Sequence, residues 1–165
     1  MHAEASLHVD APPERVWRLI TDVTRMGEWS PVTYKCEWLD GVTEAKVGAR
    51  FKGYNKMAPV HWWTICEVTR LEPGKLFAFR TIDGTFNVGS RGREMTRWRY
   101  SFEPEDIGTR ITETYDVSFI PALLRIPELI ARKIPGGGRV VDNRRAKTDR
   151  GMEETLRRLK AAAEQ

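Results

Sequence analysis

Alternating apolar and polar residues recur through most of the chain. In the first such segment Ala5, Leu7 and Val9 are apolar and the residues between them are polar. A period of two is typical of a strand with one buried face. Further alternating segments follow between residues 34 and 119, separated by turn sequences such as Glu72–Lys75. Short turns between adjacent strands predict an antiparallel meander with one covered face.

Helical spacing predicts the remaining elements. After two prolines, apolar residues three or four positions apart predict a short helix that ends at about Thr24. Residues 26–31 predict a second short helix or turn closed by a proline. Residues 140–164 predict a long amphipathic helix. Before it, an apolar stretch interrupted by proline and glycine predicts a variable, lid-like insertion over residues 121–139.

This order of elements predicts an α+β fold with two short helices near the N-terminus. A curved antiparallel sheet is expected to wrap around the long C-terminal helix, because sheets twist and one helix covers only part of a broad inner face. The gap that remains predicts an apolar pocket between sheet and helix. A length of 165 residues suits a single domain over residues 1–165.

Aromatic residues are numerous, with six Trp, six Phe and four Tyr. A single ring at strand spacing is usually core, but a set of rings on one face is typical of an apolar ligand site. Alternation and helical spacing predict a ligand-binding set on the inner face, composed of Trp29, Tyr34, Trp38, Phe51, Phe77, Phe79, Trp98, Tyr100, Tyr115, Met152 and Leu156.

Two polar residues fall on the same predicted face. Glu113 lies between Ile111 and Tyr115, and burying a carboxylate is costly unless it is paired or protonated. An ion pair with an arginine or an outward position are the structural alternatives. The functional one makes Glu113 a hydrogen-bonding partner of the ligand or a general acid/base, and it is the best catalytic candidate. Asn55 either offers its amide to a ligand or caps a strand end.

A series of short segments follows the order and spacing of a known family. They are Val9–Trp17, Asp22, Trp29–Pro31, Gly48–Asn55, Cys66–Val68, Glu72–Lys75, Phe77–Phe79, Trp98–Tyr100, Gly108–Thr112 and Thr155–Lys160. Together they resemble the START-like superfamily, also called SRPBCC or Bet v 1-like, and within it the polyketide cyclase/dehydrase-like branch. The resemblance covers about residues 3–118 and resumes at 155–160, whereas residues 121–150 do not match the common pattern well.

The resemblance implies a helix-grip fold with an apolar cavity. Members of the superfamily bind or transport lipids, sterols and polyketides, and some cyclise polyketides. The function predicted first is therefore binding or carriage of a hydrophobic small molecule such as a lipid, a sterol-like compound or a polyketide. A polyketide cyclase or dehydratase that uses the same cavity is the alternative, and a protein-interaction module is the third. Since the family has no universal catalytic residues, enzyme status stays open.

Positive charge is concentrated in one segment. The whole chain carries a net charge of +4, whereas residues 132–150 hold seven basic and two acidic residues. This segment is either a solvated helix face or a surface that attracts anionic head groups on a membrane or a negatively charged ligand near the pocket mouth. No nucleic-acid-binding motif accompanies it, so no nucleic-acid partner is expected.

The remaining residue patterns indicate no cofactor or metal. His2, His8 and His61 are too scattered for zinc, and no phosphate-binding loop has the required form. Cys36 and Cys66 are isolated and are expected to be buried thiols in a reducing compartment. Because neither a secretion signal nor a membrane-length apolar run is present, a cytoplasmic location is expected.

Overall fold

Seven strands form one antiparallel sheet in the computed structural model, which describes residues 1–86, 92–119 and 138–165, except the side chains of 138–145. The strand order is β1-β7-β6-β5-β4-β3-β2, so every pair except β1–β7 is adjacent in sequence. The meander is confirmed. The strands are β1 (His2–Val9), β2 (Thr33–Trp38), β3 (Arg50–Met57), β4 (Val60–Glu72), β5 (Leu76–Gly84), β6 (Thr96–Glu105) and β7 (Gly108–Val117).

Helices occupy the predicted places. The first, α1 (Pro13–Thr21), has proline in its first turn, where no backbone N–H is required. A 3-10 turn (Val23–Arg25) and α2 (Met26–Trp29) follow it. The C-terminal helix α4 (Gly138–Ala163) begins slightly earlier than the sequence predicts. The rest of the expected lid-like insertion, residues 121–137, lies outside the described residues.

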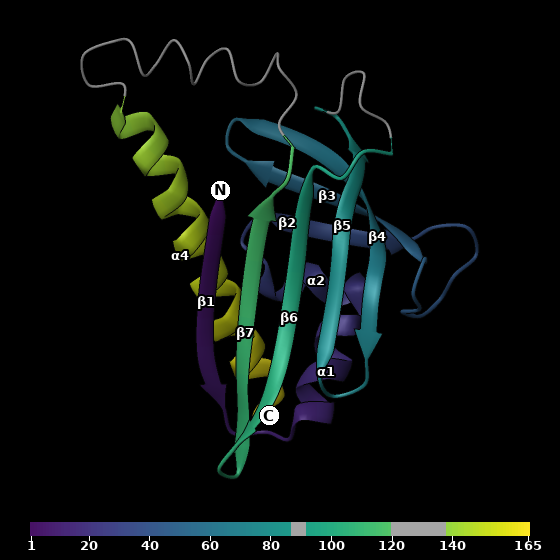
Figure 1. Ribbon diagram of the computed structural model, residues 1–165, viewed down its shortest axis with the longest axis vertical. Helices are drawn as coiled ribbons and strands as arrows, with labels where there is room; N and C mark the ends of the chain where they lie inside the picture. The colour runs from purple at the N-terminus through teal and green to yellow at the C-terminus, as the bar shows by residue number, and fades with distance from the viewer. Residues whose placement is uncertain (87–91, 120–137) are drawn as a thin grey trace.

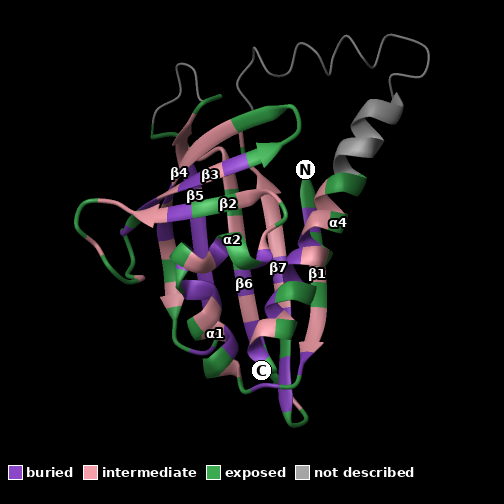
Figure 2. Cartoon of the chain, turned by 180° about the vertical axis from the view of Figure 1, so that it is seen from behind, coloured by how far each residue is buried: buried purple, intermediate pink, exposed green. Residues whose placement is uncertain are grey.

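The sheet curls around the helices, which all lie on its concave side. In Figure 1, β1, β7, β6 and β5 run nearly upright, whereas β2 and β3 cross behind them at a steep angle. Figure 2 shows the helices in front of the concave face, with α4 along β1 and beside α1 and α2. This arrangement is the helix-grip α+β fold that the resemblance implied. The apolar core joins Val16 and Ile20 of α1 to Leu156 and Leu159 of α4.

None of the helices in the described ranges combines the length and apolar character that a bilayer crossing needs.

Candidate functional site

A buried carboxyl–phenol pair lies on the concave face of β6 and β7. Glu105 and Gly108 close the β6–β7 hairpin, and the resulting register places Tyr100 of β6 directly opposite Glu113 of β7. The Tyr100 hydroxyl donates a hydrogen bond of 2.6 Å to Glu113 Oε1. The Glu113 residue is only 2% exposed. Both structural alternatives for Glu113 are therefore wrong: it points inward, and its partner is a tyrosine and not an arginine.

Burial keeps the Glu113 carboxyl neutral. Removal from water raises its pKa to about 8, although the hydrogen bond from Tyr100 lowers it in part. Burial, together with the neighbouring carboxyl, also raises the pKa of Tyr100 well above its ordinary value. At neutral pH, Glu113 therefore carries a proton. Oε1 already accepts the bond from Tyr100, so the free position for that proton is Oε2.

Two buried polar atoms in the described interior have no hydrogen-bonding partner. One is Glu113 Oε2 and the other is the indole Nε1 of Trp29 on α2. Buried polar groups without partners are rare in native proteins, and each one indicates a strain, a catalytic role or a missing bound molecule. A protonated Oε2 is a donor, and the indole N–H is a donor as well. Both suit an acceptor atom on a bound ligand.

The predicted rings form one continuous cluster on the concave face. Successive pairs are Trp38–Phe51 at 5.6 Å between ring centroids, Phe51–Phe79 at 5.1 Å, Phe77–Phe79 at 5.5 Å, Phe79–Trp98 at 6.4 Å and Trp98–Tyr115 at 4.3 Å. Phe77 also stacks on Tyr100 at 6.4 Å. The inward positions of these seven rings are therefore as the alternation predicts. Trp29, Met152 and Leu156 are buried on the helical side.

Exposure of the inward residues increases along β6 and β7 from one cross-strand pair to the next. Glu113, Tyr100 and Phe77 are neighbours in one cross-strand row, and all three are buried. In the next row, toward the C-terminal end of β7, Tyr115 and Trp98 are only partly buried. This gradient means that the concave face is closed behind Glu113 and more accessible on the side of Trp98.

A belt of small polar side chains crosses the same face beyond the rings. Thr96 donates to Thr81 at 2.8 Å, and Thr81 Oγ1 lies 3.6 Å from Cys66 Sγ. Across β3, Asn55 bonds to Thr64 at 3.4 Å and accepts from Thr33 at 2.7 Å. Sequence reasoning identified Asn55 but missed the threonines. The sequence pattern could have predicted them. Thr64 lies two residues before the inward Cys66, and Thr96 lies two residues before the inward Trp98, so both fall on the inward face of their strands.

Asn55 is buried, as an inward position requires, but its amide is already occupied by Thr33 and Thr64. It orders the belt across β2, β3 and β4. Whether the belt contacts a ligand stays a prediction.

Tyr34 is a correction to the predicted set. Alternation with Cys36 and Trp38 places it inward, yet it is 46% exposed. The cause is a β-bulge in β2, where the pairing with β3 shifts between Thr33 and Lys35. A bulge inserts one extra residue and reverses the facing of the residues on one side of it. Tyr34 therefore lies on the outer surface, where it contacts His61 at 6.4 Å between ring centroids.

Both cysteines are buried and unbridged, as predicted. Burial raises the pKa of Cys36 to about 12 and that of Cys66 to about 11. Thiols with such pKa values are almost entirely protonated at neutral pH and are poor nucleophiles. In the described ranges, no three His, Cys, Asp or Glu side chains gather into a metal-binding group.

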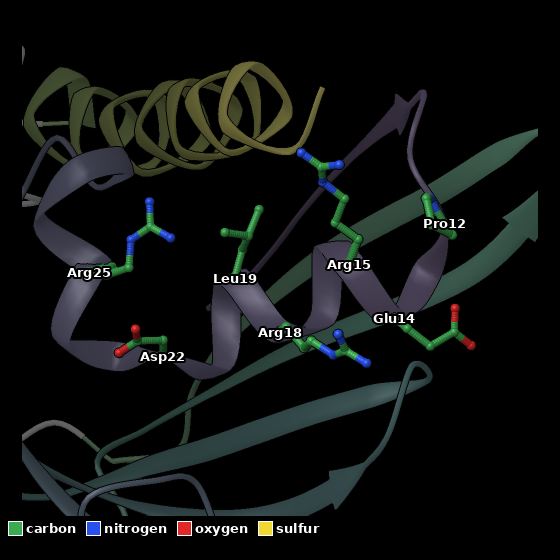
Figure 3. A pocket seen from close by; sticks show the side chains of 7 residues that line it. All are labelled: Pro12, Glu14, Arg15, Arg18, Leu19, Asp22 and Arg25. Atoms are coloured by element: carbon green, nitrogen blue, oxygen red, sulfur yellow. The ribbon is translucent and has the colours of Figure 1, made fainter. Parts of the chain in front are cut away.

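Two grooves lie on the surface of the described residues. One, of about 510 Å³, follows α1, and Figure 3 shows Arg15, Leu19 and Arg25 rising from it toward α4. The other, of about 800 Å³, separates the β3–β4 hairpin and the loop before β2 from α4. Neither groove is lined by Glu113 or by the aromatic cluster. An enclosed apolar cavity therefore remains a prediction.

Comparison with known proteins assigns the family. Residues 1–164 match the family of polyketide cyclase / dehydrase and lipid transport proteins. The chain belongs to this family. A Polyketide_cyc-like protein of Corynebacterium glutamicum, Cgl2372, is 31% identical over 96% of this chain and 88% of its own, with a TM-score of 0.62. No curated protein matches the sequence.

Solved structures of lower sequence identity share the fold. The Zhui aromatase/cyclase from Streptomyces sp. R1128 has a TM-score of 0.72 at 19% identity, over 99% of this chain and 93% of its own. A major latex-like protein from Panax ginseng has a TM-score of 0.66 at 10% identity, over 99% and 97% of the two chains. The START-like resemblance is confirmed, and a role in hydrophobic-ligand binding or polyketide cyclisation is supported at the level of the family.

Proposed function

We propose that the protein binds an apolar small molecule with a carbonyl oxygen against the concave face, and that Glu113 donates a hydrogen bond to that oxygen. The observation that carries this proposal is the buried, unpartnered Oε2 of Glu113. A neutral carboxyl whose second oxygen is already bonded by Tyr100 has one remaining donor to offer. A carbonyl oxygen is the simplest acceptor that an otherwise apolar ligand carries.

The surrounding rings supply the apolar part of this site. Trp98 and Tyr115 are partly exposed beside the buried Glu113, so a planar ligand that enters from their side reaches Oε2 with its polar end. Aromatic rings bury a large area per side chain and stack favourably on flat ligands. Purely aliphatic cargo would leave Oε2 unpartnered, which is unfavourable for a buried polar atom.

A second function, acid/base catalysis on a bound polyketone, is favoured by one specific observation. A carboxyl with a pKa of about 8 gives up and recovers a proton near neutral pH, as a general acid or base must. Glu113 would donate its Oε2 proton to a carbonyl oxygen while a solvent water takes the proton that leaves the neighbouring carbon, so that an enol forms, and the Tyr100 hydroxyl would hold the resulting carboxylate in place. The two functions use the same ligand pose and differ only in whether the proton is transferred.

The test is a set of matched ligands and two variants. Two- to four-ring aromatic ketones are each paired with the hydrocarbon in which a methylene replaces the carbonyl, and binding is measured by calorimetry. One additional hydrogen bond predicts about a tenfold preference of the native protein for the ketones. Glu113→Leu should abolish the preference and leave hydrocarbon affinity unchanged, whereas Glu113→Gln, which keeps a donor, should retain much of it.

Absence of binding by the whole series, or a ketone preference that survives in Glu113→Leu, would contradict the proposal. Turnover of a poly-β-ketone by the native protein and its loss in Glu113→Gln, with binding retained, would establish the catalytic function instead of simple carriage.

A further inference from the structure

The tip of the β3–β4 hairpin and the facing part of α4 form one continuous outer surface. It is separate from the Glu113 site, and it borders the groove of about 800 Å³ between the hairpin and α4. In Figures 1 and 2 the hairpin reaches toward α4 at the end of the sheet opposite the β6–β7 turn. We call it the hairpin surface, and its defining residues are Tyr34, Lys56, Met57, Val60, Lys147 and Arg150.

Apolar side chains are unusually exposed on the hairpin surface. Met57 is 43% exposed and Val60 is 46% exposed, and they face each other across the tight turn that joins β3 to β4. Tyr34, which the β-bulge turns outward, adds a third large apolar side chain near them. The hairpin tip therefore presents methionine and valine to solvent in the part of the chain that the structure describes.

Cations surround these apolar residues. Lys56 lies over the Tyr34 ring at 5.6 Å, and Lys147 and Arg150 face the hairpin from α4. None of the three cations forms an ion pair with another residue of the described chain. The one acidic residue that lines the groove, Glu154, is already paired with Arg157 and Arg158 on α4. The hairpin surface is therefore apolar at its tip and positively charged at its rim.

We infer that the hairpin surface docks onto an anionic lipid bilayer. Met57 and Val60 would enter the boundary between head groups and acyl chains, and Tyr34 would sit at head-group depth, where aromatic residues are favoured. Lys56, Lys147 and Arg150 would contact anionic head groups, each contributing modestly and in a salt-dependent way. This inference goes beyond the proposed ligand site and does not depend on what that site binds.

Single-stranded nucleic acid is the rival partner for a surface with lysines and aromatic rings. Such a partner needs rings whose faces are free for base stacking. Lys56 lies over the Tyr34 ring, and the Tyr54 ring on the outer face of β3 has Lys35 and Lys52 over it at 5.0 and 4.9 Å. The large exposed apolar residues of the tip, Met57 and Val60, are aliphatic and give bases nothing to stack on. The bilayer fits both features.

Vesicle flotation tests the inference with the full chain. Vesicles of phosphatidylcholine with roughly 30 mol% phosphatidylglycerol are compared with pure phosphatidylcholine vesicles, at salt concentrations from about 0.05 to about 0.5 M. The native protein should float with the anionic vesicles only, and high salt should weaken this. Met57→Asp/Val60→Asp and Lys56→Glu/Lys147→Glu should each reduce vesicle affinity by about tenfold or more.

Two control variants carry single changes of the same kinds, apolar to Asp and Lys to Glu, at the other end of the molecule. Ile107, 90% exposed in the β6–β7 turn, becomes Asp, and Lys75, exposed beside the β4–β5 turn, becomes Glu. Both controls should float as the native protein does, and circular dichroism melting confirms that all variants fold. The inference is overturned if the native protein ignores anionic vesicles, if the controls lose binding as strongly as the hairpin variants, or if single-stranded oligothymidine competes the protein off the vesicles.

Discussion

Ionisation of Glu113 is expected to lower the free energy of unfolding of the native protein by about 4 kcal/mol between roughly pH 5 and pH 9, and Glu113→Gln should lack this decrease. The pKa of Glu113 is about 8 in the folded protein and returns to its ordinary value near 4.5 on unfolding. Between these two values the folded state binds the proton and the unfolded state has lost it. Raising the pH through this window therefore favours unfolding, and the stability that the neutral carboxyl provides is lost by about pH 8. Glutamine cannot ionise, so residue 113 makes no pH-dependent contribution to the stability of the variant.

Thermal unfolding of both proteins across the pH range measures the effect. For a domain of this size, the melting temperature of the native protein should fall by roughly 10 °C more than that of Glu113→Gln from acid to alkaline pH. Other groups with raised pKa values, such as His8 beside Glu105 and Asp10, are present in both proteins and cancel in the difference. Parallel pH profiles for the two proteins would mean that Glu113 ionises normally, and the proposed donor would not exist.

Phe77→Ala is expected to lower the free energy of unfolding by about 3–5 kcal/mol, whereas Trp98→Ala should lower it less. Phe77 is fully buried between Phe79 and Tyr100, so its removal leaves a cavity within the row that contains Glu113. Trp98 is partly exposed, so part of its area is already in water. Urea denaturation gives both free energies.

The same two variants should affect ligand affinity in the opposite order, with the larger loss in Trp98→Ala. Trp98 stacks on Phe79 and contacts Tyr115 in a tilted arrangement on the accessible side of the site, where the proposed ligand would pack. Trp98→Ala should therefore weaken aromatic-ketone binding by about tenfold. If Trp98→Ala destabilises the protein as much as Phe77→Ala and leaves ketone affinity unchanged, Trp98 is core and the account of the site is wrong.

Most of the fold followed from local patterns, because alternation and turn chemistry act at short range. The pairing of Tyr100 with Glu113 could also have been predicted from the sequence. The Asp106–Ile107 turn joins Glu105 to Gly108, and counting outward from that turn brings Tyr100 opposite Glu113. The turn thus determines which phenol meets the carboxyl.

Tyr34 shows what alternation misses. A bulge inserts a residue without any required sequence signal, and one insertion reverses the facing of every residue on one side of it. The hairpin surface was also missed. Charge along the sequence places the membrane hypothesis on residues 132–150, but the hairpin residues that line the groove with Lys147 and Arg150 lie about ninety residues earlier. Only the folded chain brings these segments together.

Carbon-13 NMR of the Glu113 side-chain carboxyl tests the central claim most directly. Its signal is assigned by its loss in Glu113→Gln and titrated with and without an aromatic ketone. The free protein should show a pKa of about 8, and the ketone should raise it further, because only the protonated carboxyl donates to a carbonyl oxygen. A midpoint near the ordinary value of glutamate, or one that a bound ketone leaves unchanged, would contradict the account.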